Sequence, residues 1–157
     1  MVEVASGRDL GERPDLFAAA VINVGVMNTL RFETKANGPP NIPEFGSVKT
    51  EDGFKGLLAM DACTRVRDHT AYPAVLLTHG INDPRVEPWQ SAKLAARLQA
   101  VSTSGKPVWL RIEYDAGHGI GTTKRQRNDE RADTYAFLSH RLTAPGAEAK
   151  QEASKAQ

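Results

Sequence analysis

The sequence predicts an α/β fold of about three parallel strands with flanking helices. Three segments, 18–24, 72–80 and 107–113, are short and rich in apolar or β-branched residues, as buried strands are. Residues 88–102 lie between the last two of them and repeat apolar residues mostly at helical spacing, with a proline in the first turn. A helix that connects two strands is the crossover of a parallel pair. We therefore expect a parallel sheet covered by helices.

The remaining elements are predicted from the positions of glycine and proline and from the spacing of apolar residues. Residues 10–17 are expected to hold a helix end and a connection, since Pro14 cannot continue a helix. Segment 37–47 is rich in glycine and proline and is predicted to be an irregular loop, followed by a short helix at 54–60. The final helix, 124–142, is expected to turn these residues toward the sheet: Ala132, Tyr135, Ala136, Leu138 and Leu142.

The chain has 157 residues, enough for one hydrophobic core. We expect one folded unit over 1–142. Residues 143–157 are mostly Ala, Glu, Lys and Gln, with nothing to bury, and are predicted to form a flexible polar tail.

The composition excludes several classes of function. The content of 40% hydrophobic and 25% charged residues is ordinary, and a net charge of +1 gives no basic field for nucleic acid. No apolar run is long enough to span a bilayer, and the first residues lack the pattern of a secretory signal, so no membrane partner and a cytoplasmic location are expected. The single Cys63 excludes an intramolecular disulfide. No two histidines have helical spacing and no carboxylates cluster with them, so neither metal nor cofactor is expected.

A carboxylate and a histidine follow two successive predicted strands. Asp83 comes just after strand 72–80, and His118 lies between two glycines after strand 107–113. Parallel strands bring these loops to one edge of the sheet, so we predict that the two side chains lie within hydrogen-bond distance. A carboxylate at one nitrogen of a histidine fixes its tautomer and stabilises its cation, which a general base requires. The sequence is also compatible with a simple turn-forming role for Asp83 and with a role for His79 in supporting the Asp83 loop.

This order, acid before histidine, is that of an α/β-hydrolase, so the prediction is a partial α/β-hydrolase fold. The nucleophile of that fold occupies a strained turn of the form G-x-S-x-G, and no serine here has that frame. The nucleophilic serine is therefore not identifiable in this chain.

Other nucleophiles fit poorly. Ser6 is a weak candidate, because on the inferred helix it lies about six residues, or ~9 Å, beyond the turn where the serine is needed. Cys63 has no histidine at helical spacing to take its proton. The remaining candidates lie in loops or at helix ends, where capping is the commoner role: Ser47, Ser102 and Ser104.

Several spaced segments resemble one known family. Residues 72–77, 82–88 and 116–119 are similar to the C-terminal third of the catalytic domain in the prolyl oligopeptidase family of serine peptidases. Upstream segments match the same family in the same order, at 13–19, 23–27 and 42–47. The resemblance covers about residues 7 to 142, which would make 1–142 the C-terminal part of such a catalytic domain.

The resemblance implies roles for individual residues. Asp83 would be the triad acid and His118 the triad base, while Arg85, with Val86 beside it, would contact the bound peptide. Asn41 occupies the position where prolyl-specific members carry an aromatic ring that stacks on the substrate proline, which puts proline specificity in doubt.

The resemblance also places the nucleophilic serine just before Met1, because the family's elbow precedes segment 13–17 by about a dozen residues. Two hypotheses follow. In the first, the chain is a serine hydrolase or peptidase that acts on peptide or other acyl substrates and carries the acid and base of the triad. In the second, it is a catalytically silent, truncated fragment that acts only through binding or self-association.

The edge of the sheet suggests a partner. In a complete α/β-hydrolase, strand 18–24 would pair with the strand that leads into the nucleophile elbow, and we expect that strand to be absent from this chain. Long apolar edges recruit other strands. We therefore expect a homo-oligomer that forms through this exposed edge.

Overall fold

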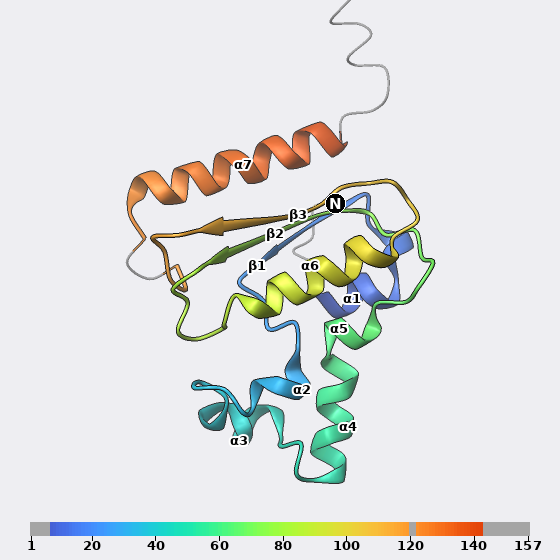
Figure 1. Cartoon of the computed structure of the whole chain (residues 1–157), viewed down its shortest axis with the longest axis vertical. Coiled ribbons are helices and arrows are strands. Elements are labelled where there is room, and N and C mark those ends of the chain that lie inside the picture. Colours follow the sequence, from blue (N-terminus) through green and yellow to red (C-terminus); the bar gives the residue numbers. More distant parts are fainter. Residues whose placement is uncertain (1–6, 120–121, 143–157) are drawn as a thin grey trace, which may run out of the picture.

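The computed structural model describes residues 7–119 and 122–142 (Figure 1). In this part of the chain, three parallel strands form one sheet in the order β1-β2-β3. The strands are β1 (Ala19–Asn23), β2 (Ala74–Gly80) and β3 (Val108–Glu113). The predicted fold class is confirmed, and each predicted strand is found within two residues of its expected bounds.

β2 is the central strand. All its residues are buried, and it pairs in parallel with β1 on one side and β3 on the other. A strand covered on both faces needs the nearly continuous apolar sequence that β2 has. Its C-terminal end is therefore held firmly, and this end carries the candidate site.

Helices cover both faces of the sheet (Figure 1). α6 (Trp89–Val101), α1 (Gly7–Glu12) and α5 (Ala62–Arg65) lie on one face, and α7 (Lys124–Leu142) lies on the other. The larger core lies on the α6 face and includes Leu10, Ile22, Val75, Leu77, Leu94 and Leu98. The α7 face has a small core of Ala74, Leu76 and Phe137.

The predicted bounds of α7 are confirmed, but its predicted apolar face is mostly wrong. Phe137 is its buried residue and Leu138 packs beside it, whereas Tyr135 is 68% and Leu142 43% exposed. Residues three or four positions apart share a helix face, so a helix that seats Phe137 on β2 turns Tyr135 away from the sheet.

Residues 29–60, between β1 and β2, form a lobe below the sheet (Figure 1). It contains α2 (Thr29–Phe32), the 3-10 turn η2 (Pro39–Asn41), α3 (Ile42–Phe45) and α4 (Glu51–Met60). The prediction of an irregular loop over 37–47 is wrong, because η2 and α3 lie within it. Prolines in the first turn of each start these helical turns, and Gly46 ends α3 with a φ of 85°.

The other helices agree with the prediction only in part. α4 begins at Glu51 rather than at residue 54, because the Thr50 side chain accepts a hydrogen bond from the Gly53 amide as a helix cap. α1 ends before Pro14, as predicted, and a 3-10 turn η1 (Pro14–Leu16) follows. The one-turn helices α2 and α5 are too short to give a periodic signal.

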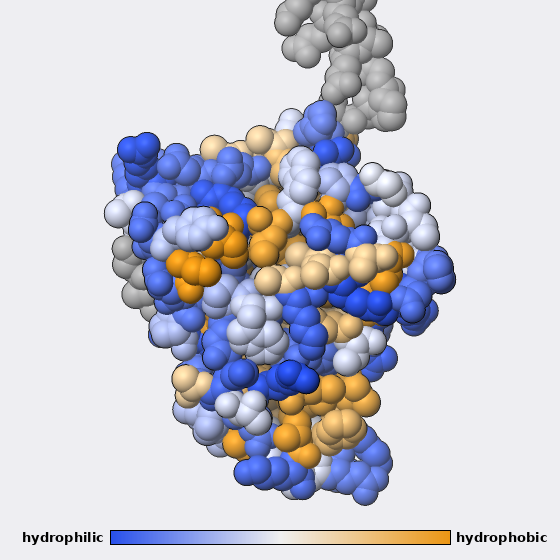
Figure 2. All heavy atoms as spheres, viewed as in Figure 1, coloured by the Kyte–Doolittle hydropathy of each residue, from blue (hydrophilic) through white to orange (hydrophobic). Residues whose placement is uncertain are grey.

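Figure 2 shows apolar side chains on this surface in the layer between α7 and α6 and again on the lobe below the sheet. The exposed hydrophobic residues include Trp109 on β3, Tyr135 on α7 and Phe54 and Leu58 on α4. Among the described residues, none of the helices is both long and apolar enough to cross a membrane. The predicted tail, 143–157, lies outside the described residues.

Candidate active site

Asp83 lies in a tight turn at the end of β2. Its Oδ1 accepts the backbone N–H of Arg85 at 2.8 Å and of Val86 at 2.9 Å. An aspartate that bonds the backbone two and three residues ahead stabilises a turn. The two bonds fix the carboxylate and leave Oδ2 for other partners.

The loop after β3 is tied to this turn by backbone hydrogen bonds. The Ile81 amide donates to the Glu113 carbonyl at 3.0 Å, and the Asn82 amide donates to the Ala116 carbonyl at 3.1 Å. Gly80 permits the approach, because a Cβ there would overlap the carbonyl oxygens of Ala116 and Gly117. The two loops that carry Asp83 and His118 are thus held against each other.

Asp83 and His118 meet across these loops. His118 Nδ1 lies 2.7 Å from Asp83 Oδ2, so the predicted proximity of the two side chains is confirmed. The Asp83 side chain is fully buried, and that of His118 is 25% exposed. Since a carboxylate only accepts, Nδ1 carries the proton, and Nε2 of the neutral ring is the acceptor. Nε2 has no hydrogen-bond partner among the described residues.

The environment favours an ionised Asp83. Burial alone would raise the pKa of its carboxyl, but the N–H donors of Val86 and Arg85 and the ring of His118 outweigh it and hold that pKa below its usual value. Asp83 is therefore a carboxylate that can orient His118 and stabilise its cation.

A second histidine contacts the same carboxylate. His79 is buried on β2, with Nε2 3.2 Å from Asp83 Oδ2 and 2.7 Å from the Val86 carbonyl oxygen. Its Nδ1 lies 2.8 Å from Ser91 Oγ on α6. The expectation that His79 supports the Asp83 loop agrees with these contacts. No sequence pattern indicated the contact of Ser91 with His79.

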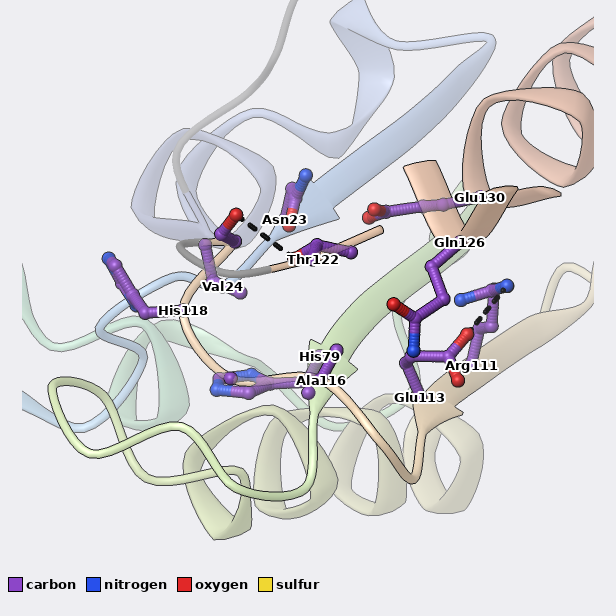
Figure 3. Close-up of a pocket in the computed structure, with 13 residues that line it drawn as sticks. Asn23, Val24, His79, Arg111, Glu113, Ala116, His118, Thr122, Gln126 and Glu130 are labelled. Atoms are coloured by element: carbon purple, nitrogen blue, oxygen red, sulfur yellow. Dashed lines mark hydrogen bonds and ion pairs between the residues drawn. The ribbon is translucent and has the colours of Figure 1, made fainter. Parts of the chain in front are cut away.

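A cavity of about 160 Å³ lies beside His118, between the strand ends and the start of α7 (Figure 3). Figure 3 shows Gln126 extending from α7 toward Glu113 and Arg111 of β3. The other polar side chains that line the cavity are Asn23, His79, His118, Thr122 and Glu130. Among the described residues that line the cavity, none is a serine or cysteine.

Three residues of the lining, Arg111, Glu113 and Glu130, make ion pairs or hydrogen bonds. Arg111 Nε lies 2.6 Å from Asp133 Oδ2 of α7, and Arg111 Nη2 lies 3.3 Å from Glu113 Oε2. Burial alone would lower the pKa of Arg111, but Asp133 and Glu113 outweigh it and raise that pKa. The Thr78 hydroxyl donates to Glu130 at 2.9 Å. These contacts join the start of α7 to β2 and β3.

The other predicted site residues lie in different places. Arg85 is exposed on the Asp83 turn, and Val86 is buried behind it. Asn41 lies on η2 in the lobe, where its side chain donates to the Asn37 carbonyl at 2.5 Å, and it does not line the cavity beside His118. Ser6 lies outside the described residues.

The alternative nucleophiles have structural partners. Ser47 donates to Glu33 at 2.8 Å, and the hydroxyls of Ser102 and Ser104 lie 3.2 Å apart. Cys63 is buried in the main core, where burial raises the pKa of its thiol to about 11. A neutral, buried thiol is a poor nucleophile. Within residues 7–119 and 122–142, no group of three or more histidine, cysteine or acidic residues could hold a metal ion.

A parallel sheet with an acid and a histidine on successive strand ends defines part of an α/β-hydrolase domain. The model of the prolyl oligopeptidase family matches residues 5–144, so the chain belongs to this family. The prolyl endopeptidase of Dictyostelium discoideum is 35% identical over 134 residues, and that of Elizabethkingia miricola is 32% identical over 137. These matches cover 82% and 87% of this chain, but only 17% and 19% of the relatives.

Solved structures agree with this assignment. A prolyl endopeptidase from a mechanistic analysis of two such enzymes superposes with a TM-score of 0.84 at 31% identity, covering 88% of this chain and 20% of that one. Prolyl oligopeptidase B of Galerina marginata gives TM-scores of 0.77, 0.78 and 0.76 at 28% identity, over 87% of this chain and 20% of that one. Those three structures hold a bound peptide substrate and carry a histidine, serine or aspartate replaced by alanine. The chain therefore spans about a fifth of the length of its relatives.

Proposed function

We propose that this chain supplies the acid and the base of a serine peptidase of the prolyl oligopeptidase type. In this proposal Asp83 is the triad acid and His118 is the general base. The hydrogen bond of 2.7 Å between Asp83 Oδ2 and His118 Nδ1 is the observation that carries it. It directs the lone pair of Nε2 away from Asp83, so that Nε2 can take a proton from a nucleophile.

The reaction is acyl transfer to water in two stages. His118 Nε2 removes the proton of a serine hydroxyl as the oxygen attacks the peptide carbonyl, and then gives this proton to the departing amine. Water repeats the sequence and releases the acid product, with His118 again taking and returning a proton. Asp83 stays ionised throughout, as its lowered pKa favours, and stabilises the His118 cation.

The serine itself must come from polypeptide other than the described residues. In the part of the chain that the structure describes, no serine or cysteine lines the cavity beside His118, and G-x-S-x-G is absent from the sequence. We propose that a strand and elbow of the kind found in the full-length relatives complete the site. The alanine variants of serine, aspartate and histidine in the Galerina marginata structures support a triad of these three residue types.

Peptides are the proposed substrates. The Arg85 side chain is exposed on the Asp83 turn, next to the site, where its guanidinium could donate to a carbonyl of a bound peptide. Val86 is buried behind this turn and would shape it rather than contact the substrate. Because Asn41 stands where prolyl-specific members have an aromatic ring, we propose a weaker preference for proline.

A hybrid protein tests this proposal. The chain would replace its matching segment in the Dictyostelium discoideum prolyl endopeptidase, and a fluorophosphonate probe would label any activated serine, located by mass spectrometry. We expect labelling of the hybrid at a serine outside this chain, loss of it on His118→Asn, and none of the chain alone. A hybrid that melts cooperatively but is not labelled contradicts the proposal. It would favour the alternative of a catalytically silent fragment.

The proposal includes self-association of the isolated chain through β1. Among the described residues, β1 pairs only with β2. The Val24 amide donates to Thr78 of β2, so the alternate residues Ala19, Val21 and Asn23 direct their backbone groups toward the unpaired side. Beside this edge lies a groove whose lining includes the apolar side chains of Val21, Tyr135 and Leu138.

Light scattering over a dilution series tests the association. We expect a dimer or larger oligomer at micromolar concentration, and a monomer after Val21→Pro, because proline removes an edge N–H donor. The matched control is Ala71→Pro, which changes an exposed loop residue. A proline at Ala96 would break α6 and is not suitable. A compact monomeric parent chain contradicts this part of the proposal. The proposed cytoplasmic location is tested by cell fractionation.

A further inference from the structure

His79 is a buried histidine whose two ring nitrogens both have partners. Nε2 faces two groups that can only accept, the Val86 carbonyl at 2.7 Å and Asp83 Oδ2 at 3.2 Å. Nε2 must therefore carry a proton. In the neutral ring Nδ1 is then an acceptor, and the Ser91 hydroxyl at 2.8 Å is its donor. Ser91 on α6 thus selects the tautomer in which His79 donates toward Asp83.

The Val86 contact closes the turn that holds Asp83. The Val86 amide donates to Asp83 Oδ1, while the Val86 carbonyl accepts from His79. One imidazole therefore holds the carboxylate and the peptide group that binds it. Ser91 and His79 are 0% and 3% exposed, so water cannot replace either contact without a change in packing.

Asp83 Oδ2 lies between two imidazoles, His118 at 2.7 Å and His79 at 3.2 Å. A carboxylate can rotate about its terminal bond, and each donor fixed in the protein restricts that rotation. Oδ1 is held by backbone, and His79 restrains Oδ2 from the buried side. The remaining direction at Oδ2 is the one that His118 occupies.

We infer that His79, oriented by Ser91, is a positioning residue that keeps Asp83 directed at His118. For catalysis this inference rests on the proposed function. The effect of His79 on the tautomer of His118 does not depend on that function, because it is measured on the chain itself. If His79 only filled space in the core, an apolar side chain of similar size would leave His118 unchanged.

Long-range 1H–15N correlation spectra of the histidine rings test the inference on the full chain, at a pH where the rings are neutral. In the parent we expect His79 in the Nε2–H form and His118 in the Nδ1–H form. His79→Gln should keep His118 in that form, because a glutamine amide can both donate to Val86 and accept from Ser91. His79→Leu should give His118 a mixture of both tautomers while the backbone amide spectrum stays folded.

Ser91→Ala is a second test variant in case His79→Leu fails to fold. Without the hydroxyl donor, His79 should show both tautomers, and the share of His118 in the Nδ1–H form should fall. Ser104→Ala, which removes a hydroxyl that bonds Ser102 far from the site, is the matched control and should change neither ring. The inference is overturned if His79 has its proton on Nδ1 in the parent, or if His118 stays wholly in the Nδ1–H form in a folded His79→Leu or Ser91→Ala protein.

Kinetics of the hybrid protein separate this inference from the proposed function. His79→Leu should lower kcat by roughly 10- to 100-fold with little change in KM, as removal of an outer partner does for metal-ligating histidines, and His79→Gln should restore most of it. An inactive hybrid with the expected parent and variant spectra contradicts the proposed function alone. An active hybrid in which His79→Leu changes neither kcat nor the His118 spectrum contradicts the positioning role alone.

Discussion

The Asn82 amide donates to the Ala116 carbonyl at 3.1 Å, and this bond joins the turn that carries Asp83 to the loop that carries His118. It forms only because β2 ends in Gly80, where the two loops touch. The distance between the acid and the histidine is thus set by backbone contacts, before either side chain is considered.

Gly80→Ala should separate the two loops. Its Cβ would meet backbone carbonyls that cannot rotate away, so we expect a loss of about 1–3 kcal/mol in the free energy of unfolding, as for other overpacked sites. Gly56→Ala on α4 is the matched control, since beyond the neighbouring helix backbone no atom lies within 4 Å of a Cβ at this position, and it should stabilise the chain by about 1 kcal/mol. Urea unfolding measures both. Equal effects of the two substitutions would show that the loops do not depend on this contact.

The ionisation of Asp83 should couple stability to pH. Its pKa is lowered in the folded chain, whereas in the unfolded chain it is close to the free value of about 3.9. The unfolded state therefore binds the proton first as the pH falls. The stabilising contribution of the ionised group is present above about pH 4 and is lost as the pH falls through the folded pKa.

Asp83→Asn should remove this contribution. The difference in the free energy of unfolding between parent and variant should be largest near neutral pH and should shrink toward pH 3. Asp115→Asn, at an exposed turn position, makes the same change of charge and is the control. A difference for Asp83→Asn that is constant from pH 7 to pH 3 would contradict the pKa shift.

Cys63 should be unreactive while the chain is folded. Because burial raises the pKa of its thiol to about 11, little thiolate forms at neutral pH, and reaction with an aromatic disulfide reagent should require unfolding. The folded state keeps its proton at a pH where the unfolded thiol, with a pKa of about 8.5, has lost it. Stability should therefore fall as the pH rises from about 9 to 11, and less so in Cys63→Ala. Rapid labelling under native conditions would show that the site is open.

Phe137 should anchor α7. It is the buried residue of that helix and packs with Ala74 and Leu76 of β2, with its ring 5.8 Å from that of Trp109. Phe137→Ala should cost about 3 kcal/mol, the lower end of the usual range for a buried phenylalanine. Tyr135→Ala, at a position that is 68% exposed, should change stability by less than about 0.5 kcal/mol. Chemical denaturation of the two variants compares them, and similar costs would mean that α7 packs in another way.

The sheet was predictable because its strands are marked by composition. β2 reads as one apolar run, and a strand buried on both faces leaves no other pattern. Asp83 and His118 were predictable because they follow successive strands. The face of α7 that is buried was not predictable, because the apolar residues of this helix fit more than one face. The packing of Phe137 against β2 decides which face is buried.

Single-turn elements could not be read from the sequence. In segment 37–47 the prolines that suggested a loop instead begin helical turns, because proline is well tolerated in a first turn. The link from Ser91 through His79 to Asp83 was hidden for another reason. It depends on the first turn of α6 packing beside the end of β2, and neither residue belongs to a known spacing pattern.

His118, oriented by Asp83, is proposed to be the general base of a peptidase, and the kcat of the hybrid protein is the decisive test of this role. His118→Asn should lower kcat for a peptide substrate by at least ~10³-fold, and Asp83→Asn by a comparable factor. His69→Asn, at an exposed histidine with a φ of 54° that asparagine tolerates, should leave kcat unchanged. If the folded His118→Asn hybrid retains the parent kcat, His118 is not the general base.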